Sequence, residues 1–146
     1  MRIRVFYEEV KFRIKGWKEI KSLIGKVISE EKNISGDLNF ILTNDNHLLK
    51  INKEFLKHNY YTDVISFDNT GDSELAHEIY ISIDTVKKNS INYNVSYKEE
   101  LIRVMIHGVL HLCGYEDRSN DEKEKMRERE DYWLNIMHKN GEEEKI

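Results

Sequence analysis

Apolar residues recur along the chain with two spacings, which together predict a domain of short strands and helices. Alternation and short apolar runs predict strands at 3–7, 38–42, 64–67 and 78–83. Apolar residues three and four apart predict helices at about 17–28, 45–55, 84–92, 97–113 and 120–138. These segments follow one another without a repeat or an obvious linker. The pattern therefore predicts a single α+β domain over residues 1–140.

Residues that favour helix N-termini stand before several of these segments. The predicted caps are Thr43-Asn44-Asp45, Asp84, and two capping boxes, Ser96 with Glu99 and Ser119 with Glu122. In the last helix the positions predicted to face the core are Met126, Tyr132, Trp133 and Ile136. The acidic residues 141–146 are predicted to form a frayed tail.

Two histidines four residues apart indicate a metal site. His107 and His111 would share one face of a helix, Gly114 would end that helix, and Asp117 would then bring a carboxylate. Three such ligands with an open position are typical of a catalytic zinc site, with one zinc ion per chain. The alternative is that Asp117 only caps the next helix, while Glu116 or water completes the metal shell.

The residue after the first histidine limits the chemistry. The spacing is close to the extended zincin pattern, in which a glutamate at this position is the general base of a metallopeptidase. Here the position is Gly108, which has no side chain to accept a proton. A zincin-like peptidase is therefore a disfavoured alternative.

The run from His107 to Asp117, HGVLHLCGYED, resembles the signature H-G-x-L-H-L-x-G-Y-D-H of the YbeY family. These are bacterial metal-dependent single-strand endoribonucleases and rRNA maturation factors. YTDVISF at 61–67 and EIYIS at 78–82 resemble two further family segments, and the resemblance spans about residues 51–130. It implies one small mixed sheet of about four strands packed with about five helices, and a metal site at the end of the penultimate helix.

Three positions depart from the family pattern. Asp117 replaces the third histidine, Leu56 stands where the family usually has an arginine, and His77 replaces a glycine. A carboxylate ligand lowers the charge of a zinc site from +2 to +1, so bound water should ionise less readily. Mn²⁺ and Mg²⁺ also become more competitive.

The resemblance implies a zinc-dependent endoribonuclease that cuts single-stranded RNA in 3′-end maturation of small-subunit rRNA and in ribosome quality control. Glu100 and Arg103 would lie on the His107 face and either orient that imidazole or a phosphate, or form a surface ion pair. Lys57 would replace the missing arginine. The proton acceptor is either Asp63 or no protein group at all.

A non-catalytic role is the remaining alternative: a ribosome assembly factor whose metal fixes the C-terminal helices. The expected partners in either case are RNA, the small ribosomal subunit and its proteins. Net charge of −4 argues mildly against nucleic-acid binding, but residues 11–26 carry six cations against Glu19 alone. That basic segment is either a solvated helix face or a surface that follows a phosphate backbone.

Composition fits a soluble cytoplasmic protein, which we expect to be a monomer. Hydrophobic residues make up 39% and charged residues 34% of the 146 residues, as in soluble globular proteins. No apolar run is long enough for a membrane span, and the chain enters a strand at once, without a visible signal peptide. The one cysteine, Cys113, is predicted to pack as a small apolar group rather than bind metal.

Overall fold

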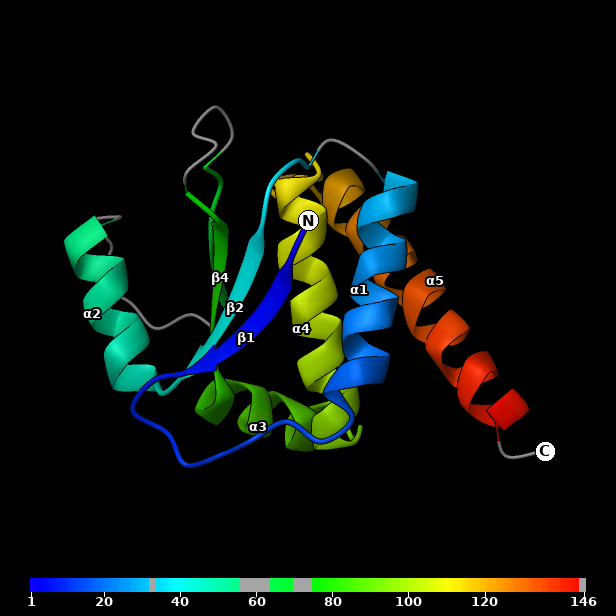
Figure 1. Cartoon of the computed structure of the whole chain (residues 1–146), viewed down its shortest axis with the longest axis horizontal. Coiled ribbons are helices and arrows are strands. Elements are labelled where there is room, and N and C mark those ends of the chain that lie inside the picture. Colours follow the sequence, from blue (N-terminus) through cyan, green and yellow to red (C-terminus); the bar gives the residue numbers. More distant parts are fainter. Residues whose placement is uncertain (32–33, 56–63, 70–74, 145–146) are drawn as a thin grey trace.

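The computed structural model describes residues 1–31, 34–55, 64–69 and 75–144 (Figure 1). Its elements are β1 (Ile3–Tyr7), α1 (Trp17–Glu31), β2 (Leu38–Thr43), α2 (Asp45–Phe55), β3 (Val64–Phe67), β4 (His77–Ser82), α3 (Ile83–Asn92), α4 (Tyr97–Leu112) and α5 (Asn120–Glu144). They confirm the predicted small α+β domain. Within the described residues, no helix combines the length and the apolar character needed to cross a membrane.

The sheet is mixed, as predicted, with strand order β1-β2-β4-β3. The strands β1, β2 and β4 run parallel, and β3 pairs antiparallel with β4. The central strands carry apolar residues that are fully buried, among them Phe40, Leu42, Ile79 and Ile81. This burial explains why β2 reads as a nearly continuous apolar run, since helices cover both faces of the central strands.

The helix α4 is the centre of the fold. Its apolar residues, such as Ile102 and Ile106, join the main core between the sheet and α1 and α5. Figure 1 shows α1 and α5 beside α4, and α2 on the other side of the sheet. There Leu48 and Ile51 of α2 pack with Ile65 in a second, smaller cluster. Because α4 is held on several sides, its exposed C-terminal face is a rigid platform for side chains.

Gly108 allows α4 to lie close to the sheet. A Cβ atom built on Gly108 would lie 2.9 Å from Cγ2 and 3.1 Å from Cδ1 of Ile79 in β4. Carbon atoms do not pack that closely, so any side chain here would push the helix from the strand. The glycine that removes the peptidase base is thus also required by the packing.

One predicted cap, Asp84, differs in the structure. The strand β4 passes directly into α3, so the N-cap is Ser82, whose Oγ accepts a hydrogen bond from Thr85 N at 3.4 Å. The expected cap, Asp84, instead accepts a hydrogen bond from the backbone N of Asp45 at 3.1 Å and so serves the first turn of α2. The prediction missed this because it considered each helix alone.

The two predicted capping boxes have different outcomes. Ser119 and Glu122 form a complete box at the start of α5, with bonds of 3.0 and 3.1 Å. Ser96 caps α4 by accepting from Glu99 N at 3.1 Å, but the Glu99 carboxylate lies 2.9 Å from His138 Nε2. The Glu99 side chain therefore pairs with His138 of α5 and does not complete the capping box.

The last helix differs from its prediction in length and in one inward position. It continues to Glu144, beyond the predicted end near residue 138 and into the segment 141–146. Met126 and Trp133 are buried as predicted, whereas Tyr132 is 40% exposed. Tyr132 meets Trp133 edge-to-face and lies under the Arg129 guanidinium, so its ring is at the edge of the core rather than inside it.

Candidate metal centre

His107, His111 and Asp117 converge as the spacing predicted. Nε2 of His107 lies 3.0 Å from Nε2 of His111, and Oδ2 of Asp117 lies 3.5 and 3.4 Å from these two nitrogens. Ligand atoms about 2.0–2.1 Å from a tetrahedral zinc ion are about 3.3 Å apart. The three donors therefore have the spacing that a zinc ion requires, and they could hold a metal ion.

The donors are partly open to solvent. The side chains of His107, His111 and Asp117 are 19%, 30% and 41% exposed. A structural zinc site is closed by a fourth protein ligand, whereas a catalytic site keeps a position for water or substrate. Three donors at an accessible surface fit the catalytic kind.

The His107 ring is oriented by a buried carboxylate. Its Nδ1 lies 3.0 Å from Oε2 of Glu130 in α5, and the side chain of Glu130 is 5% exposed. A proton on Nδ1 that is donated to this carboxylate leaves the lone pair on Nε2, the atom facing the other donors. Glu130 therefore favours the tautomer in which Nε2 could bind a metal ion.

The His111 ring is oriented by the backbone. Its Nδ1 lies 2.9 Å from the carbonyl oxygen of Tyr115. Gly114, with φ of +106°, turns the chain back at the end of α4, and Tyr115 N donates to Leu110 O at 3.0 Å. The positive φ explains the glycine, because residues with a side chain rarely adopt it. The same turn brings Asp117 toward the histidines.

Glu130 ends a buried chain of charges that begins in the first turn of α4. Arg103 donates to Glu130 Oε1 at 2.7 Å, and its Nε donates to Glu100 Oε1 at 2.7 Å. Hydrogen bonds to Glu100, opposed by burial and joined by the bond to Glu130, raise the pKa of Arg103 above its ordinary value. Burial raises the pKa of Glu130, but bonds from His107 and Arg103 outweigh it and hold that pKa below its ordinary value.

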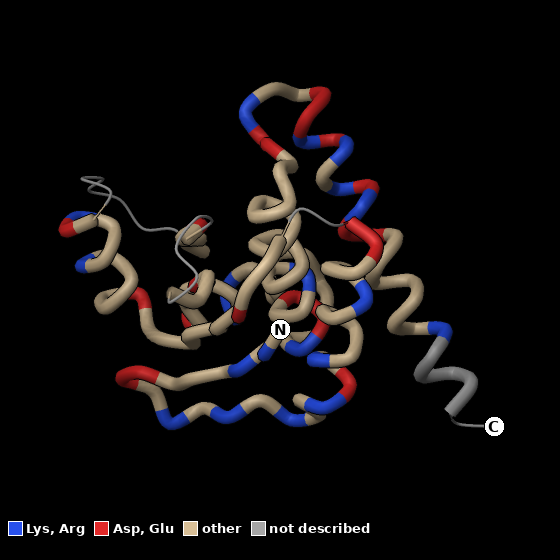
Figure 2. The backbone as a smooth tube through the Cα atoms, turned by 45° about the horizontal axis from the view of Figure 1, so that its top comes forward, with Lys and Arg blue, Asp and Glu red and all other residues tan. Residues whose placement is uncertain are grey.

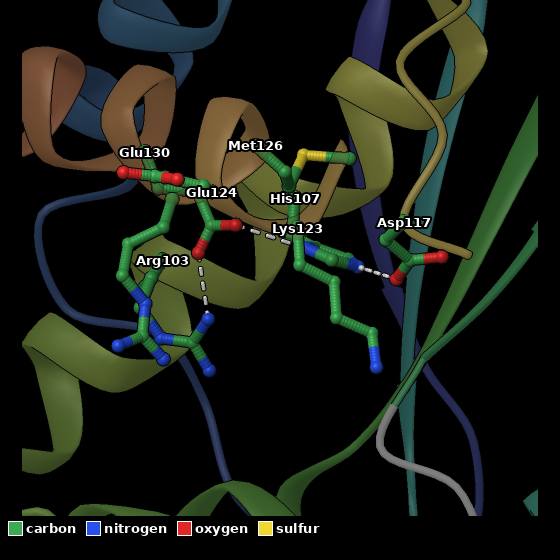
Figure 3. Close-up of a pocket in the computed structure, with 8 residues that line it drawn as sticks. Arg103, His107, Asp117, Lys123, Glu124, Met126 and Glu130 are labelled. Carbon is green, nitrogen blue, oxygen red and sulfur yellow. Dashed lines mark hydrogen bonds and ion pairs between the residues drawn. The ribbon is translucent and has the colours of Figure 1, made fainter. Parts of the chain in front are cut away.

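Glu100 and Arg103 thus lie near the metal donors, and they are linked to His107 through Glu130. Glu100 is 1% exposed and contacts Arg103, and Arg103 reaches Glu130 rather than His107 itself. Figure 3 shows Arg103 joined to the carboxylate that contacts His107. The alternative prediction, an ion pair at the surface, does not fit the deeply buried carboxylate of Glu100.

A pocket of about 410 Å³ opens next to the donors, between α4 and the start of α5. His107 and Asp117 form part of its wall (Figure 3). The charged side chains around it are Arg103, Lys123, Glu124, Arg127 and Glu130. Lys123 and Arg127 are exposed, so their cationic groups can reach a ligand that enters the pocket from solvent.

Asp117 does not act as the cap of the following helix. The helix α5 begins at Asn120, and Ser119 provides the cap through Glu122 N. The Glu116 carboxylate lies 3.4 Å from Arg118 Nε. These contacts favour Asp117 over Glu116 as the third donor. The other predicted site residues, Lys57 and Asp63, fall outside the described residues, as does Leu56.

Two other residues noted in the sequence, His77 and Cys113, are buried and contribute to the packing of the fold. His77 is 2% exposed, its Nε2 lies 2.8 Å from Ser35 O, and its Nδ1 accepts from Asn69 N at 3.1 Å. It thereby joins two loops to the start of β4. Cys113 is buried, and burial, with the nearby charge of Glu31, raises the pKa of its thiol to about 11. Cys113 packs in the main core as a small apolar group, as predicted, and a thiol that resists deprotonation is a poor metal ligand.

The contact of Glu130 with His107 was not predicted from the sequence. It stands among alternating charges in α5, where most neighbours are exposed. Its position, four residues after Met126 and three before Trp133, is nevertheless on the buried face. An acid at an inward-facing helical position was the available signal, because a buried carboxylate requires a partner.

The basic segment 11–26 begins far from the metal donors. Figure 2 shows its first part, before α1, at the bottom of the view, while the mixed charges after Asp117 are at the top. A Cβ atom on Gly16 would lie 2.9 Å from Nζ of Lys98, in the first turn of α4. Lys98 precedes His107 by nine residues, or about 13 Å along a helix. No residue of the segment lines the pocket beside the metal donors.

Comparisons with known proteins agree with the geometry. A family model described as Endoribonuclease YbeY matches residues 6–138. The chain is 43% identical over 133 residues to the Endoribonuclease YbeY of Flavobacterium psychrophilum, covering 91% of this chain and 95% of that protein. The corresponding protein of Christiangramia forsetii is 41% identical over 133 residues, covering 91% and 93%.

The fold has a counterpart of known structure. The solution structure of a Thermotoga maritima protein superposes with a TM-score of 0.65 at 25% identity, covering 97% of this chain and 93% of that one. Both the sequence and the arrangement of strands and helices thus lead to one assignment. The chain belongs to the endoribonuclease YbeY family.

Proposed function

We propose that this protein is a zinc-dependent endoribonuclease that cuts single-stranded RNA. The observation that carries the proposal is the tetrahedral spacing of His107, His111 and Asp117, in a chain whose relatives are named Endoribonuclease YbeY. A bound zinc ion would polarise a phosphate oxygen and make a nucleophilic oxygen more acidic. The protein's contribution is to hold that ion, orient its ligands and position the RNA.

The polar groups behind the ligands keep the two imidazoles in the required state. Glu130 accepts from Nδ1 of His107, and the carbonyl of Tyr115 accepts from Nδ1 of His111. Each ring therefore directs its Nε2 to the metal position. Arg103 holds Glu130 in place, so the ligand geometry is set before the substrate arrives.

The pocket beside the metal donors is the proposed seat of the RNA backbone. Lys123 and Arg127 line it and reach solvent, whereas the Arg103 guanidinium is already engaged by two carboxylates. Ammonium and guanidinium groups attract phosphates without reading bases. Lys57 would add a phosphate contact in place of the arginine that the family has at position 56.

The proton acceptor is proposed to be Asp63 or the metal's own water, since position 108 offers none. Gly108 also argues against peptide hydrolysis, because its Cβ position is 2.9 Å from Ile79 and a glutamate would not fit. In the cell we propose that the enzyme acts as a cytoplasmic monomer on the small ribosomal subunit, in 3′-end maturation of its rRNA and in ribosome quality control.

The test is cleavage of an unstructured, end-labelled RNA by the zinc-loaded protein. We expect cuts that disappear with a chelator and with His107→Ala, weaker cutting of the same RNA in a duplex, and no digestion of casein. Proteolysis would favour the peptidase. Tight zinc binding without cleavage of any RNA would instead favour a non-catalytic assembly factor.

A further inference from the structure

We infer that Glu31, at the end of α1, is a positioning residue for the metal centre and acts through Tyr115. Tyr115 has contacts in two directions. Its hydroxyl donates to Glu31 Oε2 at 2.7 Å, and its backbone carbonyl lies 2.9 Å from Nδ1 of His111. Glu31 is thus linked to a metal donor that stands eighty residues later in the chain.

The Glu31 carboxylate is built into a buried cluster of donors. Arg129 Nε donates to its Oε1 at 2.8 Å, and Trp133 Nε1 donates to the same oxygen at 3.3 Å. The side chain of Glu31 is 8% exposed. Burial raises its pKa, but the bonds from Tyr115, Arg129 and Trp133 outweigh burial and lower the pKa below its ordinary value. An ionised carboxylate, fixed on both oxygens, is a firm anchor.

The anchor holds the loop that completes the site. Tyr115 follows the turn at Gly114 and precedes Asp117 by two residues. Its partly buried ring packs against the main core, and its hydroxyl is fixed by Glu31. With both ends of Tyr115 held, its carbonyl keeps the His111 tautomer and the chain delivers Asp117 at the correct distance. Two of the three donors therefore depend on this one residue.

A carboxylate suits the position best, because it can accept from all its neighbours. Tyr115, Arg129 and Trp133 all present N–H or O–H groups to Glu31. A glutamine there could still accept from Arg129 and Trp133, but its NH₂ group would face the Tyr115 hydroxyl, which would have to turn from donor to acceptor, and the charge that binds Arg129 would be lost. The predicted consequence is a looser loop and a weaker metal site, even though residue 31 does not touch the metal donors.

The test compares zinc binding by the full-length wild type, Tyr115→Phe and Glu31→Gln. Zinc affinity is measured by competition with a chelating dye, and ligand geometry by the visible absorption of the Co²⁺-loaded protein. We expect both variants to bind zinc about 10- to 100-fold more weakly and to change the Co²⁺ spectrum. The matched controls are Tyr132→Phe and Glu30→Gln, which remove an exposed tyrosine–glutamate hydrogen bond between α5 and α1.

Thermal unfolding of the zinc-free proteins separates positioning from stability. A purely structural role would lower the unfolding temperature but leave zinc affinity and the Co²⁺ spectrum unchanged, and that outcome would overturn the inference. If Glu31→Gln does not fold, Tyr115→Phe decides the question, since it removes one oxygen and keeps the carbonyl. Failure of wild type to bind zinc would refute the metal site itself, which is a different result.

Discussion

Arg129 and Glu130 are consecutive residues of α5, yet their contacts lead to different histidines of the metal site. Glu130 accepts directly from His107, whereas Arg129 donates to Glu31, which holds Tyr115 and through it His111. Adjacent residues of a helix point about 100° apart, so one turn of α5 can serve two neighbouring elements. The C-terminal helix is therefore more than a cover for the core: its placement determines the ligand geometry.

The direct support of His107 gives the first prediction. Glu130→Gln leaves an NH₂ group facing His107 or Arg103, both of which are donors in this cluster. We expect zinc to bind about 10- to 100-fold more weakly, and the free energy of unfolding to fall by about 1–3 kcal/mol. Glu128→Gln, at an exposed position on the same helix, is the control and should change neither quantity. Equal zinc affinity in the two variants would refute the role of Glu130.

The close approach of α4 to the sheet gives a prediction on stability. Gly108→Ala forces a Cβ against Ile79, and we expect it to lower the free energy of unfolding by about 1–3 kcal/mol. Gly25→Ala in α1 meets nothing within 4 Å and should raise it by about 0.5–1 kcal/mol. Urea unfolding measures both. Stabilisation by both substitutions would show that the helix can move away from β4 without cost.

The pocket cations give a prediction on RNA binding. Lys123→Met and Arg127→Met should each raise KM for a short single-stranded RNA with little change in kcat or zinc content. The slope of log(1/KM) against log salt concentration should shrink by about 0.7 for each lost phosphate contact. Lys125→Met is the matched control, since Lys125 is exposed nearby but does not line the pocket. An equal rise in KM for all three variants would mean that RNA binding depends only on the net charge of the protein.

The lowered pKa of Glu31 gives a prediction on pH. Because its folded pKa lies below the ordinary 4.5, ionised Glu31 stabilises the protein above that value, and the contribution is lost as pH falls through the folded pKa. Arg129, Tyr115 and the Cys113 thiol face this carboxylate.

The measurement is urea unfolding of zinc-free wild type and Glu31→Gln. The variant should be about 1–3 kcal/mol less stable at neutral pH, and the difference should shrink below pH 4.5. Glu30→Gln, which changes a largely exposed carboxylate, should show a much smaller difference. If the difference in unfolding free energy between wild type and Glu31→Gln stays constant from neutral pH to below pH 4.5, the lowered pKa of Glu31 is contradicted.

The sequence predicted local features well, because they depend on residues close together in the chain. The i, i+4 pair His107 and His111 needed only a helix, and Gly114 needed only a turn. The features it missed depend on contacts between distant elements. Glu130 contacts His107 because α5 packs against α4, and Asp84 accepts from the first turn of α2 because two helix N-termini meet. No local pattern contains these distances.

Gly108 shows in another way what could not be predicted from the sequence. From the sequence it indicated a missing catalytic base, which was a statement about chemistry. The structure adds that a side chain there would collide with Ile79, so the same residue is also a packing requirement. A single sequence could not distinguish these two reasons, because the register between α4 and β4 is set by the whole core.

The central claim is that His107, His111 and Asp117 hold the metal on which RNA cleavage depends. The most direct measurement is a zinc titration of chelator-stripped wild type, Asp117→Asn and Asp117→His, with bound zinc and RNA cleavage followed in the same samples. In the wild type both should saturate together at about one zinc per chain. Asp117→Asn should need far more zinc, because a neutral amide replaces an anionic donor, whereas Asp117→His should still bind tightly. Equal zinc affinity in wild type and Asp117→Asn, or RNA cleavage by zinc-free protein, would contradict the claim.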